Sequence, residues 1–218
     1  MFCYCTFLDF YRGLRSIYSK AAFFYNKPMS SKIILIGGSS HVGKTLIAQK
    51  LLERTGFPYL SLDHLKMGLI RSGRTDLTPE DDYEMRYFLW PLVAEMIKTA
   101  IENDQNMIIE GCYIPGEWKD SFNQEYLSKI YCTFITMSEE YLRKNIKLVK
   151  DKANVIEHRL YDKVDLERLI LCSKEFKADC RKYAIPNLEI DENTIYDADA
   201  FAEKILKEAI KHHEGRTE

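Results

Sequence analysis

The chain has 218 residues, 46% of them hydrophobic, and a formal net charge of −2 at pH 7. This length and apolar content suffice for one domain with a sizeable core. The near-neutral charge argues against a nucleic-acid or other polyanionic partner. No apolar run approaches the length of a membrane span, so we expect no membrane partner.

The six cysteines have neither a paired C-x-x-C spacing nor a histidine-rich companion segment. This pattern predicts neither a zinc site nor a disulfide framework. Reduced thiols are typical of cytoplasmic proteins, and we therefore expect a cytoplasmic location.

Residues 1–28 differ from the rest in carrying nine aromatic residues and four basic residues against one acid. Their roughly helical apolar spacing would suit an amphipathic membrane or targeting helix, but the regions of a secretory signal are absent. Met29 precedes Ser30, Ser31 and the first predicted strand. We favour an N-terminal extension over 1–28 that is not part of the folded domain, and a domain over 29–218.

A short apolar run, Lys32 to Ile36, leads into a glycine loop and then a predicted helix that ends near Gly56. The loop matches G-x-x-x-x-G-K-[ST], the phosphate-binding pattern, in the strand-loop-helix context that the pattern requires. The candidate nucleotide-binding residues are Gly38, Ser39, Ser40, His41, Val42, Gly43, Lys44, Thr45 and Leu46. The pattern predicts that Lys44 contacts the β- and γ-phosphates and that the Thr45 hydroxyl binds Mg²⁺.

A second predicted strand, beginning near Phe57, ends in Asp63. In an open α/β sheet, ligands bind beyond the carboxyl ends of the strands, so Asp63 is expected to share a crevice with Lys44. Its carboxylate could accept the proton of an attacking hydroxyl, or it could N-cap a helix from Leu65 to Ile70. Both roles are compatible.

Arg71 and Arg74 follow at the end of that helix. A pair of guanidinium groups near the base would recognise an anionic substrate group. The alternative is a solvated helix end, where cations are favoured in any case.

Thr78, Pro79 and the following acids predict the start of a long helix, capped by Thr78. Pro91 lies inside its apolar pattern and predicts a kink or an interruption. The next predicted strand ends in Glu110 and Gly111, which we assign to substrate binding. An acid at this position also commonly holds Mg²⁺, so Glu110 is the candidate metal ligand together with Thr45.

A fourth predicted strand covers 130–137, and Ser138 is expected to cap the helix that follows. The segment of about 143–160 then predicts a basic lid, whose cations would neutralise a transferring phosphoryl group. Its basic residues are Arg143, Lys144, Lys147, Lys150, Lys152 and Arg159. We choose Arg159 as catalytic and Lys152 as the next candidate, although a charge run is more often a solvated helix face. A helix over 162–183, a fifth strand and a closing helix over 199–211 complete the pattern.

These elements, in this order from Met29 to Lys211, resemble the small P-loop kinases, a group that includes shikimate and gluconate kinases, chloramphenicol phosphotransferase, zeta toxin and 2-phosphoglycerate kinases. Only the segment Gly38–Thr45 is highly specific. The resemblance implies a five-stranded parallel sheet flanked by helices with a helical lid, ATP and Mg²⁺ as cofactors, and phosphoryl transfer to a small acceptor. Lys44 and Thr45 match the phosphate and metal ligands, and Asp63 matches the acid that contacts the acceptor hydroxyl.

The sequence thus predicts an ATP-dependent kinase of a small, anionic acceptor such as 2-phosphoglycerate, acting as a monomer or homodimer. Catalysis is assigned to Lys44, Asp63 and Arg159. A nucleoside monophosphate kinase is an alternative, although the lid lacks the paired arginines of adenylate kinases. A second alternative is a regulator that binds ATP and hydrolyses it slowly.

Overall fold

The structure is a computed structural model that describes residues 32–152 and 165–214. The expected extension over 1–28 and the lid residue Arg159 lie outside these ranges. The described strands are β1 (Ile33–Gly38), β2 (Tyr59–Ser61), β3 (Met107–Glu110), β4 (Ile130–Met137) and β5 (Asn187–Ile190). The helices are α2 (Lys44–Thr55), α3 (Leu62–Arg71), α4 (Asp82–Glu102), η1 (Trp118–Ser121), α5 (Gln124–Leu127), α6 (Glu139–Lys152), α7 (Leu166–Tyr183) and α8 (Ala198–Glu214).

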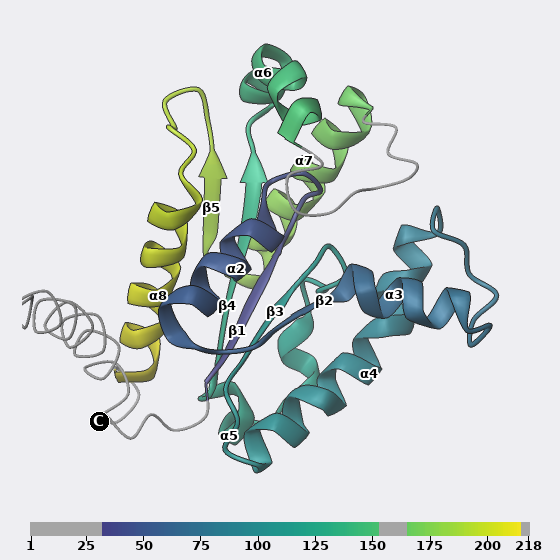
Figure 1. The fold of residues 1–218 in the computed structure, drawn as a ribbon, viewed down its shortest axis with the longest axis vertical. Helices are drawn as coiled ribbons and strands as arrows, with labels where there is room; N and C mark the ends of the chain where they lie inside the picture. The colour runs from purple at the N-terminus through teal and green to yellow at the C-terminus, as the bar shows by residue number, and fades with distance from the viewer. Residues whose placement is uncertain (1–31, 153–164, 215–218) are drawn as a thin grey trace, which may run out of the picture.

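The five strands form one parallel sheet in the order β2-β3-β1-β4-β5, with β1 at its centre (Figure 1). β1 is buried along its whole length, as expected for a strand of a parallel sheet that is covered on both faces. The predicted fold class, a five-stranded parallel sheet flanked by helices, is therefore confirmed. Because β3 and β4 both pair with β1, the ends of these three strands bring distant residues to one edge of the sheet.

Alternate residues of β1 pack into two separate cores, as the period of a strand requires. Ile33 and Leu35 face a core that contains residues of α3, α4, η1 and α7. Ile34 and Ile36 face a second core, which contains residues of α2, α6, α7 and α8. The sheet is thus the middle layer of three (Figure 1).

The second strand and the third helix start differently from the prediction. β2 ends at Ser61, which pairs with Glu110, and α3 begins at once with Leu62. Leu62 is fully buried, so packing of this side chain draws the first helical turn toward the core. We had predicted that Asp63 ends the strand and N-caps the helix, and both predictions were wrong. Asp63 is the second residue of α3, and Ser61 occupies the N-cap position.

The start of α4 is also later than predicted. The Thr78 N–H and hydroxyl both donate to Asp81 Oδ2, at 2.7 and 2.8 Å, which closes a turn before the helix. The helix begins at Asp82 with Asp81 at the N-cap, so the assignment of Thr78 as the cap was wrong. α4 continues through Pro91 without interruption. Pro91 lies on the exposed side of the helix, where water can satisfy the carbonyl that loses its partner.

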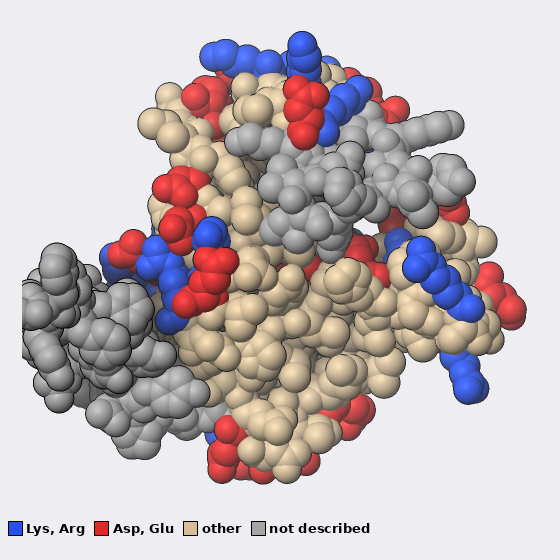
Figure 2. All heavy atoms as spheres, viewed as in Figure 1, with Lys and Arg blue, Asp and Glu red and all other residues tan. Residues whose placement is uncertain are grey.

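Acidic and basic side chains lie side by side on the face shown in Figure 2, at the top over α6 and at the left near α2 and α8. The ion pairs Arg54–Asp199 and Lys50–Glu53 join side chains of this kind on α2 and α8. No helix within the described ranges is long and apolar enough to cross a membrane.

Candidate active site

The loop between β1 and α2 has a backbone that favours glycine at two places. Gly38 has φ 115° and Gly43 has φ 83°, both in the region that L side chains rarely adopt. A Cβ on Gly38 would lie 2.0 Å from the Ile135 carbonyl oxygen of β4. The pattern glycines therefore permit a tight turn directly against the neighbouring strand, as a phosphate-binding loop requires.

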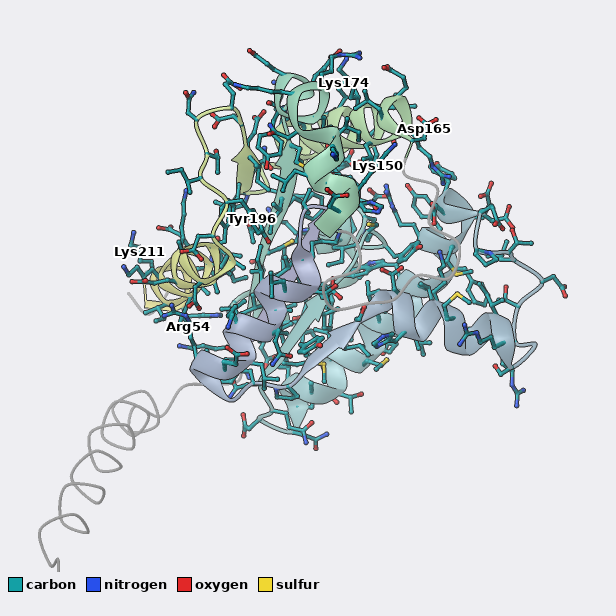
Figure 3. The ribbon with its side chains drawn as sticks, turned by 45° about the horizontal axis from the view of Figure 1, so that its top comes forward. Arg54, Lys150, Asp165, Lys174, Tyr196 and Lys211 are labelled. Carbon is teal, nitrogen blue, oxygen red and sulfur yellow. The ribbon has the colours of Figure 1, made fainter. Side chains whose placement is uncertain are left out.

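Neighbouring elements hold this loop in place. The Ser39 N–H donates to the Ile135 carbonyl at 3.1 Å, and the Ser173 hydroxyl of α7 donates to Ser39 Oγ at 2.9 Å. Tyr196, between β5 and α8 (Figure 3), approaches from another side, because a Cβ on Gly43 would lie 2.0 Å from its hydroxyl. The Val42 side chain is buried in the core that contains α2. The loop is thus supported by the elements on either side of it.

The remaining predicted loop residues take part in different ways. The Leu46 side chain packs against the core that contains α2 and α8, so any nucleotide contact from Leu46 would come from its backbone. His41 has φ 64°, and Ser40 lies partly exposed beside it. The backbone N–H of Ser40 stabilises the thiolate form of Cys172, yet burial raises the pKa of that thiol to about 11.

Lys44 is the first residue of α2 and is buried. Its ammonium donates to the Ser39 carbonyl at 2.7 Å and to Cys112 Sγ at 3.3 Å. Burial by itself lowers the pKa of Lys44, but the acidic groups of Cys112, Glu110 and Asp63 outweigh burial and raise it. Lys44 is therefore a cation at neutral pH, close to Glu110 and Asp63, which the sequence predicted near it, and to Cys112, which it did not.

The two candidate metal ligands meet in the structure. The Thr45 hydroxyl donates to Glu110 Oε1 at 3.1 Å, although 65 residues separate them in the chain. Burial raises the pKa of Glu110, and Lys44, Ser61 and Thr45 act in the opposite direction. A buried carboxylate with a hydroxyl beside it is the kind of oxygen donor pair that Mg²⁺ uses.

Asp63 and Gly111 lie beside this cluster. Asp63 is partly buried, and its charge influences the pKa values of both Lys44 and Glu110. Gly111 directly follows Glu110, and a Cβ there would lie 2.7 Å from Leu62 Cβ. The close contact between Gly111 and the first turn of α3 thus places Asp63 next to the end of β3.

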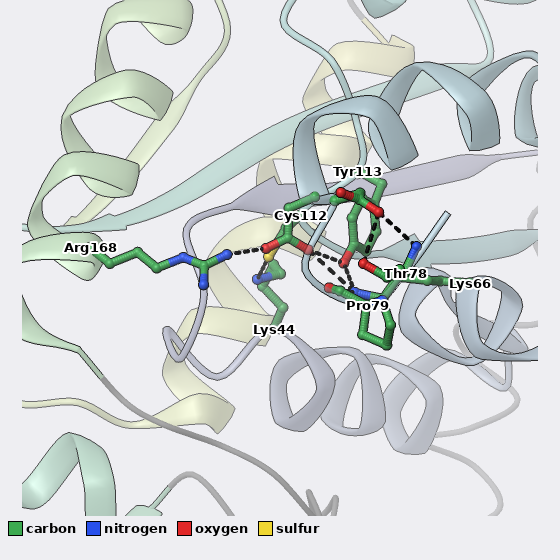
Figure 4. A network of polar contacts seen from close by, with 9 residues as sticks. Lys44, Lys66, Thr78, Pro79, Cys112, Tyr113 and Arg168 are labelled. Carbon is green, nitrogen blue, oxygen red and sulfur yellow. Dashed lines mark hydrogen bonds and ion pairs between the residues drawn. The ribbon is translucent and has the colours of Figure 1, made fainter. Parts of the chain in front are cut away.

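The sequence analysis missed a second polar cluster next to this one (Figure 4). Lys66 is buried and donates to the Pro79 carbonyl at 3.1 Å, to the Tyr113 hydroxyl at 2.5 Å and to Asp82 Oδ1 at 3.3 Å. The Tyr113 hydroxyl donates to the same Asp82 oxygen at 2.8 Å. Arg168 of α7 donates to the other oxygen, Asp82 Oδ2, at 2.7 Å.

The signal for Lys66 was present in the sequence but was read differently. Lys66 follows Asp63 by three residues, which places both on one side of a helix. Arg71 and Arg74 received the anion-binding role instead, yet both are exposed at the far end of α3. Arg71 lies about 12 Å along the helix from Asp63, from a rise of about 1.5 Å per residue. The structure does not bring Arg71 or Arg74 to Lys44 and Glu110.

The described part of the basic segment forms the end of α6. Arg143 is paired with Glu139 and Glu167, and Lys174 of α7 also pairs with Glu139. The helix has a non-helical residue at Asn145. Arg159 and the rest of residues 153–160 of the predicted lid lie outside the described residues, and so does the side chain of Lys152; their roles remain predictions.

Several solved structures of other proteins share this fold. Shikimate kinase from Acinetobacter baumannii, in complex with shikimate, has a TM-score of 0.55 and 17% sequence identity to this chain. The aligned region covers 87% of this chain and 97% of the shikimate kinase chain. Tunicamycin resistance protein of Deinococcus radiodurans has a TM-score of 0.54 at 15% identity, covering 82% and 95%. A gluconokinase from Sinorhizobium meliloti 1021 has a TM-score of 0.52 at 15% identity, covering 85% and 95%.

At these identities the likeness is one of fold, and on that level the predicted resemblance to P-loop small-molecule kinases is confirmed. No protein-family profile matches the chain. No curated protein sequence matches it either.

Proposed function

We propose that this chain is an ATP-dependent phosphotransferase that phosphorylates a hydroxyl of a small, anionic acceptor. The observation that carries the proposal is the hydrogen bond from Thr45 to the buried Glu110, beside the Lys44 ammonium, at the carboxyl edge of the sheet. In an α/β sheet this edge is where ligands bind. The fold shared with known small-molecule kinases supports the same conclusion.

The chain's own residues have separate tasks in this scheme. The loop backbone and Lys44 would bind the phosphates of ATP, and the positive charge of Lys44 would stabilise charge that develops in the transition state. Asp63 would orient the acceptor hydroxyl and accept its proton. Arg159, as predicted from the sequence, would contribute a cation from the lid.

Thr45 and Glu110 would hold Mg²⁺. Among the described residues, no group of three or more His, Cys, Asp or Glu side chains is placed to bind a metal ion. Mg²⁺ suits such a sparse site, because it is usually bound by one or two protein ligands together with substrate phosphates and waters. When bound, Mg²⁺ would neutralise negative charge on the nucleotide phosphates.

We infer an anionic acceptor, with 2-phosphoglycerate as the specific candidate, because cations gather beside Asp63. Lys66 is one helical turn from it, and Arg168 reaches the same region from α7. We further propose a cytoplasmic enzyme that acts as a monomer or homodimer. Neither a membrane nor a nucleic acid is part of the proposed activity.

The test is production of ADP from Mg-ATP by the full chain, screened against 2-phosphoglycerate, gluconate, shikimate, nucleoside monophosphates, nucleosides and neutral sugars. We expect one acceptor class to stimulate turnover. Asp63→Asn should then lower kcat by about 10²- to 10⁴-fold, the usual contribution of a general base, while nucleotide binding is retained. His64→Gln, a change at the exposed neighbouring residue, is the matched control. Slow hydrolysis that ignores every acceptor and the Asp63 substitution would instead favour the ATP-binding regulator.

A further inference from the structure

In the second polar cluster, the Asp82 carboxylate accepts hydrogen bonds in the way that a bound anionic ligand would. Asp82 receives donors from three different parts of the chain: Lys66 on α3, the Tyr113 hydroxyl after β3, and Arg168 on α7. Two donors converge on one oxygen and the third on the other. A substrate carboxylate or phosphate group offers the same pair of oxygens to such donors.

Two of the three donors, Lys66 and Tyr113, are more deeply buried than Asp82. The Lys66 side chain is only 9% exposed, whereas the Asp82 side chain is 49% exposed. Arg168 is 64% exposed, and an ion pair between groups so accessible contributes about 0–1 kcal/mol. Lys66 and Tyr113 are therefore the fixed part of the cluster, and the Asp82 carboxylate is the part that an incoming group can displace at low cost.

Displaced Asp82 would keep a favourable environment. It is the first residue of α4, and an acid in the first turn of a helix is stabilised by the N–H groups and the dipole there. Its removal would leave the buried Lys66 ammonium without the one carboxylate that it contacts in the described structure. Because an unpaired buried charge is costly, the cluster requires an anion in that place.

The cluster lies next to the phosphate-binding residues. Tyr113 follows Cys112, whose sulfur is 3.3 Å from the Lys44 ammonium. Lys66 is one turn of α3 after Asp63, the proposed base. An anionic group bound by Lys66 and Tyr113 would thus belong to a molecule whose hydroxyl can reach Asp63.

We propose that Lys66, the Tyr113 hydroxyl and Arg168 form the subsite that recognises the negatively charged group of the acceptor, and that Asp82 occupies this subsite until the acceptor displaces it. This inference rests on the proposed phosphotransferase function and assigns the anion-binding role to residues other than Arg71 and Arg74. Asp82 then acts as a competitor that rejects neutral molecules, since these cannot replace its charge.

The test measures binding directly, by calorimetry on the full chain saturated with Mg²⁺ and a non-hydrolysable ATP analogue. The probes are 2-phosphoglycerate, gluconate and shikimate as anions, with glucose and glycerol as neutral polyols. We expect at least one anionic probe to bind and the neutral polyols not to bind. Asp82→Asn removes the competing charge and should tighten the anion's binding by about 2- to 5-fold, because the Asp82 carboxylate is half exposed and its ion pairs are correspondingly weak. Glu84→Gln, the same loss of charge on the same exposed helical turn, should leave it unchanged.

Variants of the donors complete the test. Tyr113→Phe keeps the aromatic ring over Lys66, at 5.0 Å from its ammonium, but removes a donor. We expect Tyr113→Phe to weaken anion binding by about 10-fold or more, as for loss of a buried hydrogen bond to a charged group. Arg168→Gln should weaken it by about 2- to 5-fold, because Arg168 is exposed. Arg71→Gln should have little effect. Thermal unfolding of each variant checks that the fold is intact.

The inference would be overturned if Asp82→Asn and Glu84→Gln changed anion binding equally. It would also be overturned if Arg71→Gln weakened anion binding while Tyr113→Phe and Arg168→Gln did not. Absence of binding by every anionic probe, in the wild type and in Asp82→Asn, would also overturn it. The proposed function is judged separately by acceptor-stimulated ADP production. Anion binding without such turnover would contradict the phosphotransferase but not the subsite. Turnover with an unaltered KM in Asp82→Asn, Tyr113→Phe and Arg168→Gln would contradict the subsite alone.

Discussion

Substitution of Gly38 by alanine tests whether the loop geometry is as tight as described. The new Cβ would lie 2.0 Å from the Ile135 carbonyl oxygen and 2.5 Å from its nitrogen, and these are backbone atoms of the paired strand β4. They cannot move without disturbing the ladder between β1 and β4. The left-handed backbone costs a non-glycine residue about 1–2 kcal/mol, and forcing an extra carbon into a packed region costs about 1–3 kcal/mol more. We expect a loss of about 2–5 kcal/mol in the free energy of unfolding.

Gly56→Ala is the matched control, because it isolates the backbone contribution. Gly56 has φ 73° and is the C-cap of α2, the helix that follows the loop, but a Cβ there would have nothing within 4 Å. We expect a loss of about 1–2 kcal/mol. Urea unfolding followed by circular dichroism measures both variants. Equal losses for Gly38→Ala and Gly56→Ala would refute the argument that β4 restricts the loop.

Three further predictions concern the site and its supports. Thr45→Val keeps the shape of the side chain but removes the hydroxyl that donates a hydrogen bond to Glu110. It should abolish the Mg²⁺ dependence of ATP binding measured by calorimetry, and Thr45→Ser should retain that dependence. Glu110→Gln tests the raised pKa of Glu110. The folded state binds this proton more tightly than the unfolded state, so the stability of the wild type relative to Glu110→Gln should fall as the pH rises from about 4.5 through the raised pKa. Urea midpoints of the two proteins that change in parallel with pH would contradict this. Ser138→Ala removes the acceptor of the Tyr141 N–H at 2.9 Å and should cost about 1 kcal/mol in urea unfolding, whereas no change would mean that the cap is dispensable.

Where the sequence predicted the fold well, the signals were local. The phosphate-loop pattern, the apolar strand before it and Gly56 after it together predicted β1 and α2, and β4 has the predicted bounds. The predicted Ser138 cap is also present. Each of these signals depends on residues within a few positions of one another, where propensity and capping chemistry act.

Errors arose where tertiary packing decided the local structure. Leu62 is buried against Gly111, so α3 begins at Leu62 and its N-cap is Ser61, two residues before the predicted cap Asp63. The turn between Thr78 and Asp81 likewise competes with an early start of α4. In both places a side-chain contact overrode the residue preferences from which the helix start was predicted.

The second polar cluster could not be predicted from the sequence for a different reason. Its bonds to Asp82 come from residues 16, 31 and 86 positions away. No spacing rule connects such positions, because the sheet order β2-β3-β1-β4-β5 and the placement of α7 bring them together. Thr45 and Glu110 could be assigned to one metal site because the phosphate loop follows β1 and Glu110 ends the neighbouring strand β3, and ligands bind beyond the carboxyl ends of such strands.

The most direct test of the central claim follows the phosphoryl group itself. The full chain is incubated with ATP labelled with ¹⁸O in the γ-phosphate, Mg²⁺ and the acceptor that stimulates ADP production, and the products are analysed by mass spectrometry. Transfer predicts that the labelled phosphoryl group appears on the acceptor, and that Lys44→Ala abolishes this product. Label found only in inorganic phosphate, or full transfer by Lys44→Ala, would contradict the account.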